Sequence, residues 1–385
     1  MKSRSPKRIF IVAGEASGDL HASHLVNALR GHLPEAEFVA WGGAHLAATG
    51  ADLKEDLVES SVMGFVPVLL SLGGLLGTVA RFEEELRQNP PDLLIIVDYP
   101  GLNLNLARLA RRHGVPVVSY ICPQVWAWAP WRIWKVARRS DLLLLILPFE
   151  EEIYRRVHKR AHFVGNPVFD HLARRDAEDP PERIRTSEEF HPHGKPCLAL
   201  FPGSRRQEIR ETLGAQCRVA ESLLKEQDYH VVVSCQRPAL LPAIKEKTLS
   251  SSIPVEIYSG PARDLQVASD LSLVCSGTAT LEQAWYGTPM VVMYAASEVE
   301  RVLYRNFSVA PYFALVNLFA GRQVVPEVLF TPGDEEAVIR NARQLIRGDH
   351  RERVRQDLLR LKEDRFEPGA AERGAEEIAR FVMQR

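Results

Sequence analysis

The sequence of 385 residues is poor in the features that mark several large classes of protein. Its five cysteines form no CxxC pair and no metal-ligand spacing, so we expect buried thiols in a reducing compartment. HExxH and Walker A motifs are both absent. A formal net charge of −1 provides no global field that would recruit nucleic acid, and we expect no such partner. The short basic start lacks an apolar signal core, which predicts a cytoplasmic protein.

Two further motifs are missing, and each absence narrows the chemistry. The glycine pattern G-x-G-x-x-G does not occur, which argues against the nucleotide domain of a dehydrogenase. Asp-x-Asp does not occur either, which argues against a glycosyltransferase that carries its diphosphate on a divalent metal. We therefore expect no metal and no cofactor. An arginine and helix dipoles would then have to stabilise a departing diphosphate.

Charge is also missing from one long stretch, residues 60–80. Its length would nearly span a bilayer, but Pro67, the pair Gly73–Gly74, Gly77 and several hydroxyl groups argue against a membrane-spanning helix. Three interpretations stay open: a buried core helix, a groove for an apolar ligand, and a surface that dips into a membrane.

The chain is long enough for about two domains, and its apolar pattern repeats in two halves. Runs rich in Leu, Ile and Val predict strands covered on both faces, as in a parallel sheet. We expect them at residues 8–13, 37–41, 93–97, 116–121, 142–147 and 162–164, and again at 197–201, 230–234, 255–258, 271–275 and 290–294. This pattern predicts an α/β protein with two Rossmann-like, doubly wound domains, residues 1–167 and 168–351, facing each other across a cleft. A charged helical stretch, about residues 352–385, is expected to pack back on the first domain.

In the second half, two turns follow strands and open helices, where backbone N–H groups favour a phosphate. The first turn contains Gly203, Ser204 and Arg205, and the guanidinium of Arg205 suits phosphate oxygens. An ordinary capping box between Ser204 and Gln207 is the alternative explanation of the same pattern.

The second turn, Ser276-Gly277-Thr278, again joins a strand to a helix. Thr278 and Thr280 supply hydroxyl groups, and Glu282 lies about one turn inside, where a carboxylate can accept both hydroxyls of a ribose. The alternative is that Glu282 only complements the helix dipole. Two such turns in one domain favour binding of a nucleoside diphosphate, and we assign its binding site to the second half.

The turns of the first half carry acids. Glu15 and Asp19 lie in the opening turn, and Asp98 follows five apolar residues at the end of another strand. Carboxylates accept hydrogen bonds from sugar hydroxyls, and we expect partial desolvation to raise the basicity of Asp98. The alternatives are an N-cap role for Asp98 and hydrogen-bonded turn acids at Glu15 and Asp19.

Four tryptophans, Trp126, Trp128, Trp131 and Trp134, fall within nine residues without forming one helical face. Some are expected in the core, and others either stack on a sugar or line a path for an acyl chain. The spacing does not distinguish between them.

Seven motifs together give the chain a specific resemblance to a known family. They are VAGEASGD, DYPGLN, PQVWAW, VGNP, PGSR, SGTATLE and LVNLFAGRQVVPE, in order from Ile9 to about residue 329. In this combination the chain resembles the lipid-A-disaccharide synthase family, which is similar to GT-B glycosyltransferases and has no metal requirement. The resemblance implies transfer from UDP-2,3-diacylglucosamine to 2,3-diacylglucosamine 1-phosphate, with release of UDP and inversion of the anomeric centre.

The resemblance also implies roles for residues of this chain. Asp98 becomes the candidate general base for the acceptor 6-hydroxyl. The acceptor pocket would contain Glu15, Ser17, Gly18, Asp19, Gln124, Trp126 and Arg132. UDP would be held by Gly203, Ser204, Arg205, Ser276, Gly277, Thr278 and Glu282, with Asn317 and Arg322 nearby.

Because both implied substrates are acylated, the resemblance favours a lipid groove or membrane-dipping role for residues 60–80. It also implies a peripheral location on the inner face of the inner membrane, and it leaves a homo-oligomer open. Two alternatives stay open as well: another GT-B transferase or epimerase acting on a UDP-sugar, and a nucleotide-sugar-binding protein without turnover. The chain departs from the family pattern at Ala129 and Ala295, where basic residues are expected, and at Val316, which replaces a proline.

Overall fold

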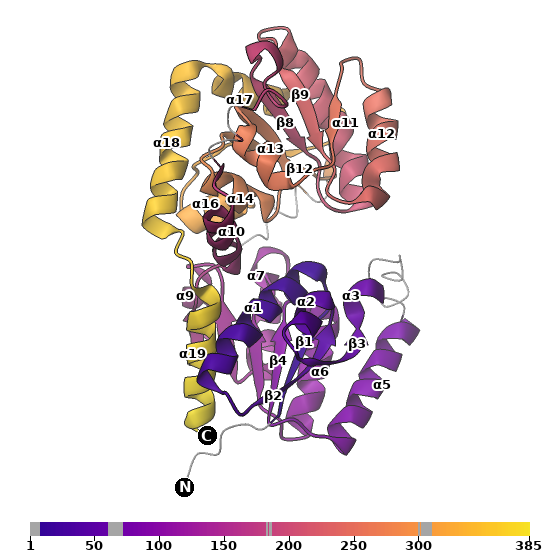
Figure 1. Ribbon diagram of the computed structural model, residues 1–385, viewed down its shortest axis with the longest axis vertical. Coiled ribbons are helices and arrows are strands. Elements are labelled where there is room, and N and C mark those ends of the chain that lie inside the picture. Colours follow the sequence, from indigo (N-terminus) through magenta and orange to yellow (C-terminus); the bar gives the residue numbers. More distant parts are fainter. Residues whose placement is uncertain (1–7, 61–71, 182–183, 185–186, 299–300, 302–309) are drawn as a thin grey trace. The chain divides into compact units, whose positions relative to one another are not determined.

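The computed structural model describes residues 8–60, 72–181, 184, 187–298, 301 and 310–385 of the chain. The chain divides into two compact units, Met1–Pro167 with Pro368–Arg385 and Val168–Glu367 (Figure 1). Each unit contains a parallel sheet flanked by helices. The α/β class and the doubly wound pattern expected from the sequence are therefore confirmed.

The first unit is built on a seven-stranded sheet in which neighbouring strands are parallel. The strand order is β3-β2-β1-β4-β5-β6-β7, so the direction of winding reverses between β1 and β4. The strands are β1 (Arg8–Ala13), β2 (Glu37–Gly42), β3 (Asp52–Asp56), β4 (Leu93–Val97), β5 (Val117–Tyr120), β6 (Leu142–Leu145) and β7 (Ala161–Phe163). The helices are α1 (Ala16–His32), α2 (Ala44–Ala48), α3 (Leu57–Ser60), α5 (Leu72–Gln88), α6 (Pro100–Arg112), α7 (Val125–Trp128), the 3₁₀ helix η2 (Pro130–Arg132), α8 (Ile133–Arg139), α9 (Glu150–Arg155) and α19 (Ala370–Met383).

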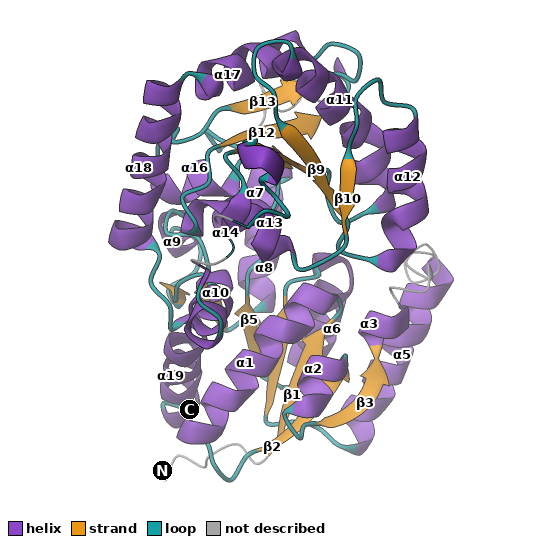
Figure 2. Ribbon diagram, turned by 45° about the horizontal axis from the view of Figure 1, so that its top comes forward, coloured by secondary structure: helices purple, strands orange, loops and turns teal. Residues whose placement is uncertain are grey.

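The central strands of this sheet are apolar along their whole length because helices cover both faces. On one face, Phe10, Trp41 and Phe82 pack edge to face, with ring centroids 5.4–5.8 Å apart, in a core shared with α5 and α6. The opposite face is covered by α1 and α19, which lie side by side (Figure 2). Gly374 of α19 faces Leu25 of α1, so the C-terminal helix is part of this core.

The second unit repeats the architecture with a six-stranded sheet of order β10-β9-β8-β11-β12-β13, which reverses between β8 and β11. The buried Gln216 joins these two strands, because its Nε2 donates to the carbonyl oxygens of Phe201 (3.1 Å) and Leu273 (3.0 Å). The strands are β8 (Cys197–Phe201), β9 (His230–Ser234), β10 (Glu256–Tyr258), β11 (Leu271–Cys275), β12 (Met290–Ala295) and β13 (Glu327–Phe330). The helices are α10 (Pro167–Glu178), η4 (Pro192–Gly194), α11 (Arg206–Leu224), η5 (Pro238–Leu240), α12 (Leu241–Leu249), α13 (Ala262–Ala268), α14 (Ala279–Trp285), α16 (Leu315–Ala320), α17 (Glu336–Ile346) and α18 (Gly348–Arg365).

The structure differs from the sequence-based expectation in three elements. The strands β3 and β13 were not predicted, and both lie at sheet edges, where one-sided burial leaves a weaker apolar signal. The stretch 352–385 is divided between two helices, of which α18 lies in the second unit and α19 in the first.

Within the described residues, no helix combines the length and the apolar character needed to cross a membrane. Most of the uncharged stretch 60–80 lies outside these residues, since residues 61–71 are not described. Its three interpretations therefore stay predictions.

Candidate functional site

Open α/β sheets bind ligands at the carboxyl ends of the strands that flank a reversal of strand order. In the first unit these strands are β1 and β4, which lead into residues 14–19 and 98–99. In the second unit they are β8 and β11, which lead into residues 203–205 and 276–278. The turns identified in the sequence thus lie at the two switch points, which we call the first-unit site and the second-unit site.

The two turns of the first-unit site touch each other. Gly14 packs against the ring of Tyr99, and a Cβ at Gly14 would collide with that ring. Burial raises the pKa of the Tyr99 hydroxyl and the negative charge of Glu15 raises it further, so Glu15 lies near Tyr99. Ser17 is exposed at the start of α1, whereas Gly18 is buried against β1 and β4. The structure therefore brings Glu15 and the turn of Asp98 together.

The turn that carries Asp98 has an unusual backbone. Asp98 and Tyr99 both adopt left-handed conformations, with φ of 44° and 47°. Such angles are costly for residues with a side chain and persist where surrounding contacts fix them. The buried Asn103 supplies that contact, because its Nδ2 donates to the carbonyl oxygens of Val97 (2.9 Å) and Asp98 (2.8 Å). The backbone at Asp98 is thereby held at the end of β4.

Two expectations about Asp98 need correction. The apolar strand before it predicts partial desolvation, but burial ends at Val97 and Asp98 is exposed. The N-cap alternative is also wrong, because the N-cap residue of α6 is Tyr99. Asp98 therefore presents a solvent-accessible carboxylate at the switch point.

Asp19 has a structural role in this unit. Its side chain is buried, and its Oδ1 accepts the N–H groups of Gly43 (2.8 Å) and Leu46 (3.2 Å) while its Oδ2 accepts that of His45 (2.9 Å). These bonds hold the start of α2. The turn-acid alternative therefore describes the contacts that Asp19 makes in this structure, and its expected contact with an acceptor sugar stays a prediction.

Trp126 lies in the core rather than on a ligand surface. Its Nε1 donates to Oε1 of Glu150 (2.8 Å), and its ring packs edge to face against Phe149 with centroids 4.7 Å apart. The structure thus shows a packing role for Trp126, and its expected contact with the acceptor stays a prediction. Of the neighbouring candidates, Gln124 is half-buried at the N-cap of α7, and Arg132 is exposed at the end of η2.

Glu150 is a candidate residue that sequence reasoning missed. It begins α9 just after β6 and is completely buried, and its Oε2 accepts the N–H groups of Ile146 (3.2 Å) and Leu147 (3.0 Å). Burial raises its pKa to about 7, and the negative charge of Asp98 acts in the same direction. Two carboxylates thus influence each other at the carboxyl ends of β4 and β6. An acid three residues after the end of the apolar run 142–147 was the available signal.

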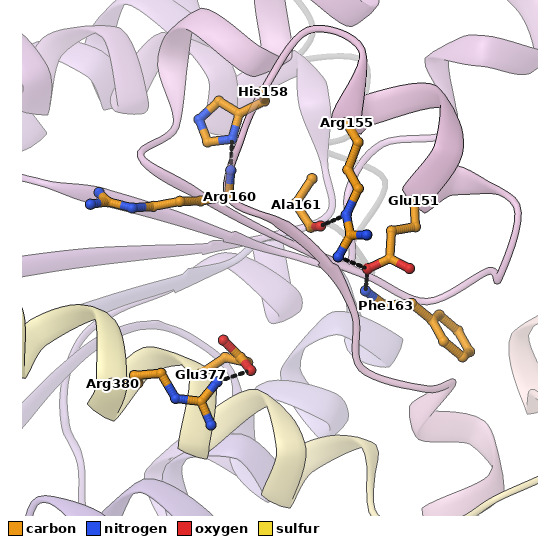
Figure 3. Close-up of polar contacts among 8 residues, drawn as sticks. All are labelled: Glu151, Arg155, His158, Arg160, Ala161, Phe163, Glu377 and Arg380. Carbon is orange, nitrogen blue, oxygen red and sulfur yellow. Dashed lines mark hydrogen bonds and ion pairs between the residues drawn. The ribbon is translucent and has the colours of Figure 1, made fainter.

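The helix that begins at Glu150 is tied to the neighbouring strand (Figure 3). Oε1 of Glu151 pairs with Arg155 (2.9 Å) and accepts the N–H of Phe163 (3.3 Å). Arg155 in turn donates from Nε to the carbonyl oxygen of Ala161 (3.3 Å). These contacts join α9 to β7 and thereby fix the position of Glu150.

In the second-unit site, the first turn bends at Gly203, whose φ of 111° favours glycine. A Cβ at Gly203 would collide with the carboxylate of Glu208. Oε2 of Glu208 accepts the N–H groups of Ser204 (2.7 Å) and Arg205 (3.1 Å). A capping box is therefore present, but it joins Arg205 and Glu208 instead of Ser204 and Gln207.

Glu208 thus accepts hydrogen bonds from two backbone N–H groups that were expected to contact a phosphate. The side chain of Arg205 is 69% exposed, and its Nη1 lies 3.4 Å from Oε1 of Glu208. The second turn is close by. Burial, followed by the negative charge of Glu208, raises the pKa of Cys275 to about 12, so the end of β11 lies near Glu208.

The second turn leads into α14 at Thr278, which is exposed. Ser276 donates from Oγ to the carbonyl oxygen of Phe313 (3.1 Å), which ties this turn to the segment before α16. Thr280 was expected to offer a hydroxyl to a ligand, but it is buried and donates to the carbonyl oxygen of Gly277 (2.9 Å). Thr278 is therefore the threonine of this turn that faces solvent.

Two further candidates have defined partners. Oε2 of Glu282 accepts a hydrogen bond from Nε2 of Gln266 (2.6 Å), and burial raises the pKa of this carboxyl. A side chain from α13 thus orients the acid one turn inside α14. Arg322 is exposed and pairs with Asp357 at 3.4 Å.

Asn317 is buried, and its amide is fully used inside the protein. Its Nδ2 donates to the carbonyl oxygen of Val325 (2.9 Å) and to Oε2 of Glu327 (2.9 Å). Its Oδ1 accepts the N–H groups of Val324 (2.8 Å) and Val325 (3.0 Å). An amide has two donor hydrogens and two acceptor positions, so none is left for a nucleotide. The structure therefore shows a structural role for Asn317, and its expected contact with UDP stays a prediction.

Among the described residues, one group could ligate a metal ion, namely His32, Glu372 and Glu376. Nε2 of His32 lies 2.7 Å from Oε1 of Glu372. These residues belong to α1 and α19 and lie outside the two sites.

The chain matches known proteins over nearly its whole length. The family model described as lipid-A-disaccharide synthetase matches residues 9–380. The chain is 38% identical over 381 residues to a lipid-A-disaccharide synthase of Myxococcus xanthus, covering 98% of each protein. It is 34% identical over 379 residues to the enzyme of the same name from Syntrophus aciditrophicus, covering 96% of each.

Solved structures share the fold at low sequence identity. The S. aureus MnaA–UDP co-structure has a TM-score of 0.69 and 15% identity, over 98% of this chain and 97% of that one. The calicheamicin glycosyltransferase CalG4 has a TM-score of 0.56 and 15% identity, over 98% and 99%. The UDP-GlcNAc 2-epimerase of Neisseria meningitidis has a TM-score of 0.60 and 12% identity, over 98% and 100%. The chain thus shares its fold with solved structures of a UDP-sugar epimerase and of a glycosyltransferase.

Proposed function

The chain belongs to the lipid-A-disaccharide synthase family of glycosyltransferases, and on this premise we propose that it joins UDP-2,3-diacylglucosamine to 2,3-diacylglucosamine 1-phosphate. The products are the lipid A disaccharide 1-phosphate and UDP, and the anomeric centre is inverted. The observation that carries the proposal is the match of residues 9–380, which includes both sites.

In the first unit, Asp98 is the proposed general base. Its exposed carboxylate takes the proton of the acceptor 6-hydroxyl while that oxygen attacks the anomeric carbon of the donor. The bond from the anomeric carbon to the diphosphate breaks, and UDP leaves with the electron pair. Attack opposite the leaving group accounts for inversion. Glu15, near the same turn, is placed to accept a hydrogen bond from the acceptor sugar.

In the second unit, the exposed guanidinium of Arg205 is the proposed contact for the diphosphate, because its planar donors match phosphate oxygens. The turn Ser276–Thr278 completes the phosphate contact, and Glu282 accepts the ribose hydroxyls. Glu208 keeps the turn at Gly203 in shape through its backbone hydrogen bonds. The charge that develops on the leaving diphosphate is stabilised by Arg205 and by helix dipoles, without a metal.

We also propose that the protein is cytoplasmic and binds peripherally to the inner face of the inner membrane. Both proposed substrates carry acyl chains, so at least one must be collected from a membrane surface. Residues 60–80 are the proposed lipid-contacting stretch.

The first experiment is to measure UDP release from UDP-2,3-diacylglucosamine by the purified protein in EDTA, with and without the 1-phosphate acceptor. We expect release only with acceptor, together with a disaccharide phosphate. Release without acceptor, or a 2-epimerised donor, would instead identify a hydrolase or an epimerase. Loss of activity in EDTA that a divalent metal restores would refute the metal-free mechanism.

Asp98→Asn tests the base. We expect kcat to fall at least a hundredfold, within the usual range for general base catalysis, while the affinity for UDP is unchanged. Isothermal titration with UDP serves as the control for folding of the second unit. A variant with normal kcat would remove Asp98 from the mechanism.

A further inference from the structure

A short segment after β5 gathers exposed aromatic groups and charge of one sign. Residues 130–139 form η2 and α8 and contain four basic residues and no acid. Trp131 is 69% exposed and Trp134 is 55% exposed. Large apolar side chains gathered on a surface mark an interaction site more often than chance exposure does.

Although both tryptophans are exposed, the helix α8 is packed firmly against the protein. Val136 and Ala137 of α8 are buried, and α8 packs against α6. Arg139 fixes this contact, because its Nη1 donates to the carbonyl oxygen of Leu104 in α6 (2.8 Å). The helix α8 therefore has a buried side, while Trp134 of α8 and Trp131 of the preceding η2 are exposed.

The cations of this segment lie close enough to repel one another. Burial lowers the pKa of Lys135, and the charges of Arg139, Arg132 and Arg108 lower it further. Arg108 also lowers the pKa of Arg139, after the effect of burial. In the described part of the chain, the charges that act on Lys135 are thus all positive. A bound anionic surface would relieve this repulsion.

We propose that a Trp–Arg surface on α6, η2 and α8 docks onto the headgroup layer of an anionic lipid bilayer; it comprises Arg108, Trp131, Arg132, Trp134, Lys135 and Arg138. Tryptophan is enriched at headgroup depth, because its ring is apolar and its N–H meets polar groups. Each cation near an anionic lipid surface strengthens binding roughly fivefold. Since the whole chain has a net charge of −1, the attraction must come from such a local group.

A bilayer fits this surface better than other anionic or aromatic-binding partners. Single-stranded nucleic acid binds in grooves lined by aromatic side chains, whereas η2 and α8 present a short exposed helical surface. The proposed function, on which this choice rests, requires acylated substrates that reside in a membrane. The surface is separate in sequence from residues 60–80, so the two can be tested independently.

The test is cosedimentation of the full-length protein with vesicles that contain no substrate. Mixed vesicles of phosphatidylcholine and phosphatidylglycerol are compared with pure phosphatidylcholine at several salt concentrations. We expect binding to the mixed vesicles that weakens as salt rises, and a blue shift of tryptophan emission on binding. Because these vesicles support no turnover, the result does not depend on whether the proposed reaction is correct.

Two double variants assign the binding to this surface. Lys135→Gln with Arg138→Gln should weaken binding to the mixed vesicles by roughly thirtyfold, since two cations are lost. Trp131→Ala with Trp134→Ala should abolish the blue shift. Lys245→Gln with Leu249→Ala, an exposed cation and an exposed apolar residue of α12, is the matched control and should bind like the wild type. UDP affinity and thermal unfolding check that each variant is folded.

The proposal is overturned if the cation variant binds as tightly as the wild type or if the blue shift persists without the two tryptophans. Tighter binding to RNA or heparin than to mixed vesicles, with the same loss in the cation variant, would also overturn it and indicate a polyanion site.

Discussion

At the scale of single residues, the buried carboxyl of Glu150 makes the stability of the first unit depend on pH. Its pKa in the folded protein, about 7, lies above the ordinary value of 4.5 because of burial. The folded state therefore binds the proton more tightly, and the resulting stabilisation is complete below about pH 4.5 and is lost as pH rises through about 7. Glu150→Gln should remove this loss, so its urea midpoint should change less between pH 5 and 8 than that of the wild type.

The same variant should be less stable than the wild type at every pH in this range. The amide cannot accept from Trp126, Ile146 and Leu147 together, and an unmade buried hydrogen bond costs about 1–3 kcal/mol. His158→Gln is a control in which the pH dependence of stability has the opposite sign. Burial lowers the pKa of His158, so the stability that the neutral imidazole contributes to the folded protein is lost as pH falls. A pH slope in Glu150→Gln equal to that of the wild type would contradict the role assigned to Glu150.

Single residues also show where sequence reasoning stops. The positions of Glu15, Asp98 and Arg205 at switch points could be predicted, because each follows the abrupt end of an apolar strand. The partners of Asp19 and Trp126 could not, because they come from distant segments that only folding brings near. A polar residue in a motif can therefore bind either a ligand or a distant segment of the chain, and only its hydrogen-bond partners distinguish the two.

At the scale of elements, the segment from α16 to β13 depends on Asn317 for its shape. The side-chain amide of Asn317 forms hydrogen bonds with the backbone of Val324 and Val325. The carboxylate of Glu327 accepts an N–H group at the start of α16. We expect Asn317→Ala to destabilise the second unit by about 1–3 kcal/mol, because buried backbone groups lose their partner. Arg322→Ala should leave stability within about 0.5 kcal/mol of the wild type, since Arg322 is exposed, but should weaken UDP binding.

Urea unfolding and UDP titration on both variants separate these effects. The converse pattern, with a stable Asn317→Ala and an unstable Arg322→Ala, would contradict the assignment of Asn317 to structure.

Strand prediction succeeded where strands are buried on both faces. The interior strands β1, β4, β8 and β11 have the predicted bounds, because continuous apolar runs end sharply at glycine, proline or polar residues. The edge strand β3 reads Asp-Leu-Lys-Glu-Asp and carries no such signal. Its place in the sheet follows from pairing with β2, a long-range contact that local composition does not contain.

At the scale of the whole molecule, the chain closes its first unit with its last helix. The unit contains residues 1–167, and α19 returns to it after the 200 residues of the second unit, Val168–Glu367. Ile378 of this helix is fully buried. In addition, Nε of Arg373 donates to the carbonyl oxygen of Val164 (2.8 Å). Stability of the first unit therefore depends on a segment that follows the second unit in the sequence.

This arrangement predicts a unit-specific effect in the full-length protein. Ile378→Ala should destabilise the first unit by about 2–5 kcal/mol, the usual cost of truncating a buried aliphatic side chain, and leave the second unit unchanged. In calorimetry, the transition that UDP shifts upward marks the second unit, because a ligand of the folded state stabilises only the unit that binds it. We expect the other transition to move down, and Glu376→Ala, an exposed change on the same helix, to move neither. If the UDP-sensitive transition falls as far as the other, α19 supports both units and its assignment to the first alone is wrong.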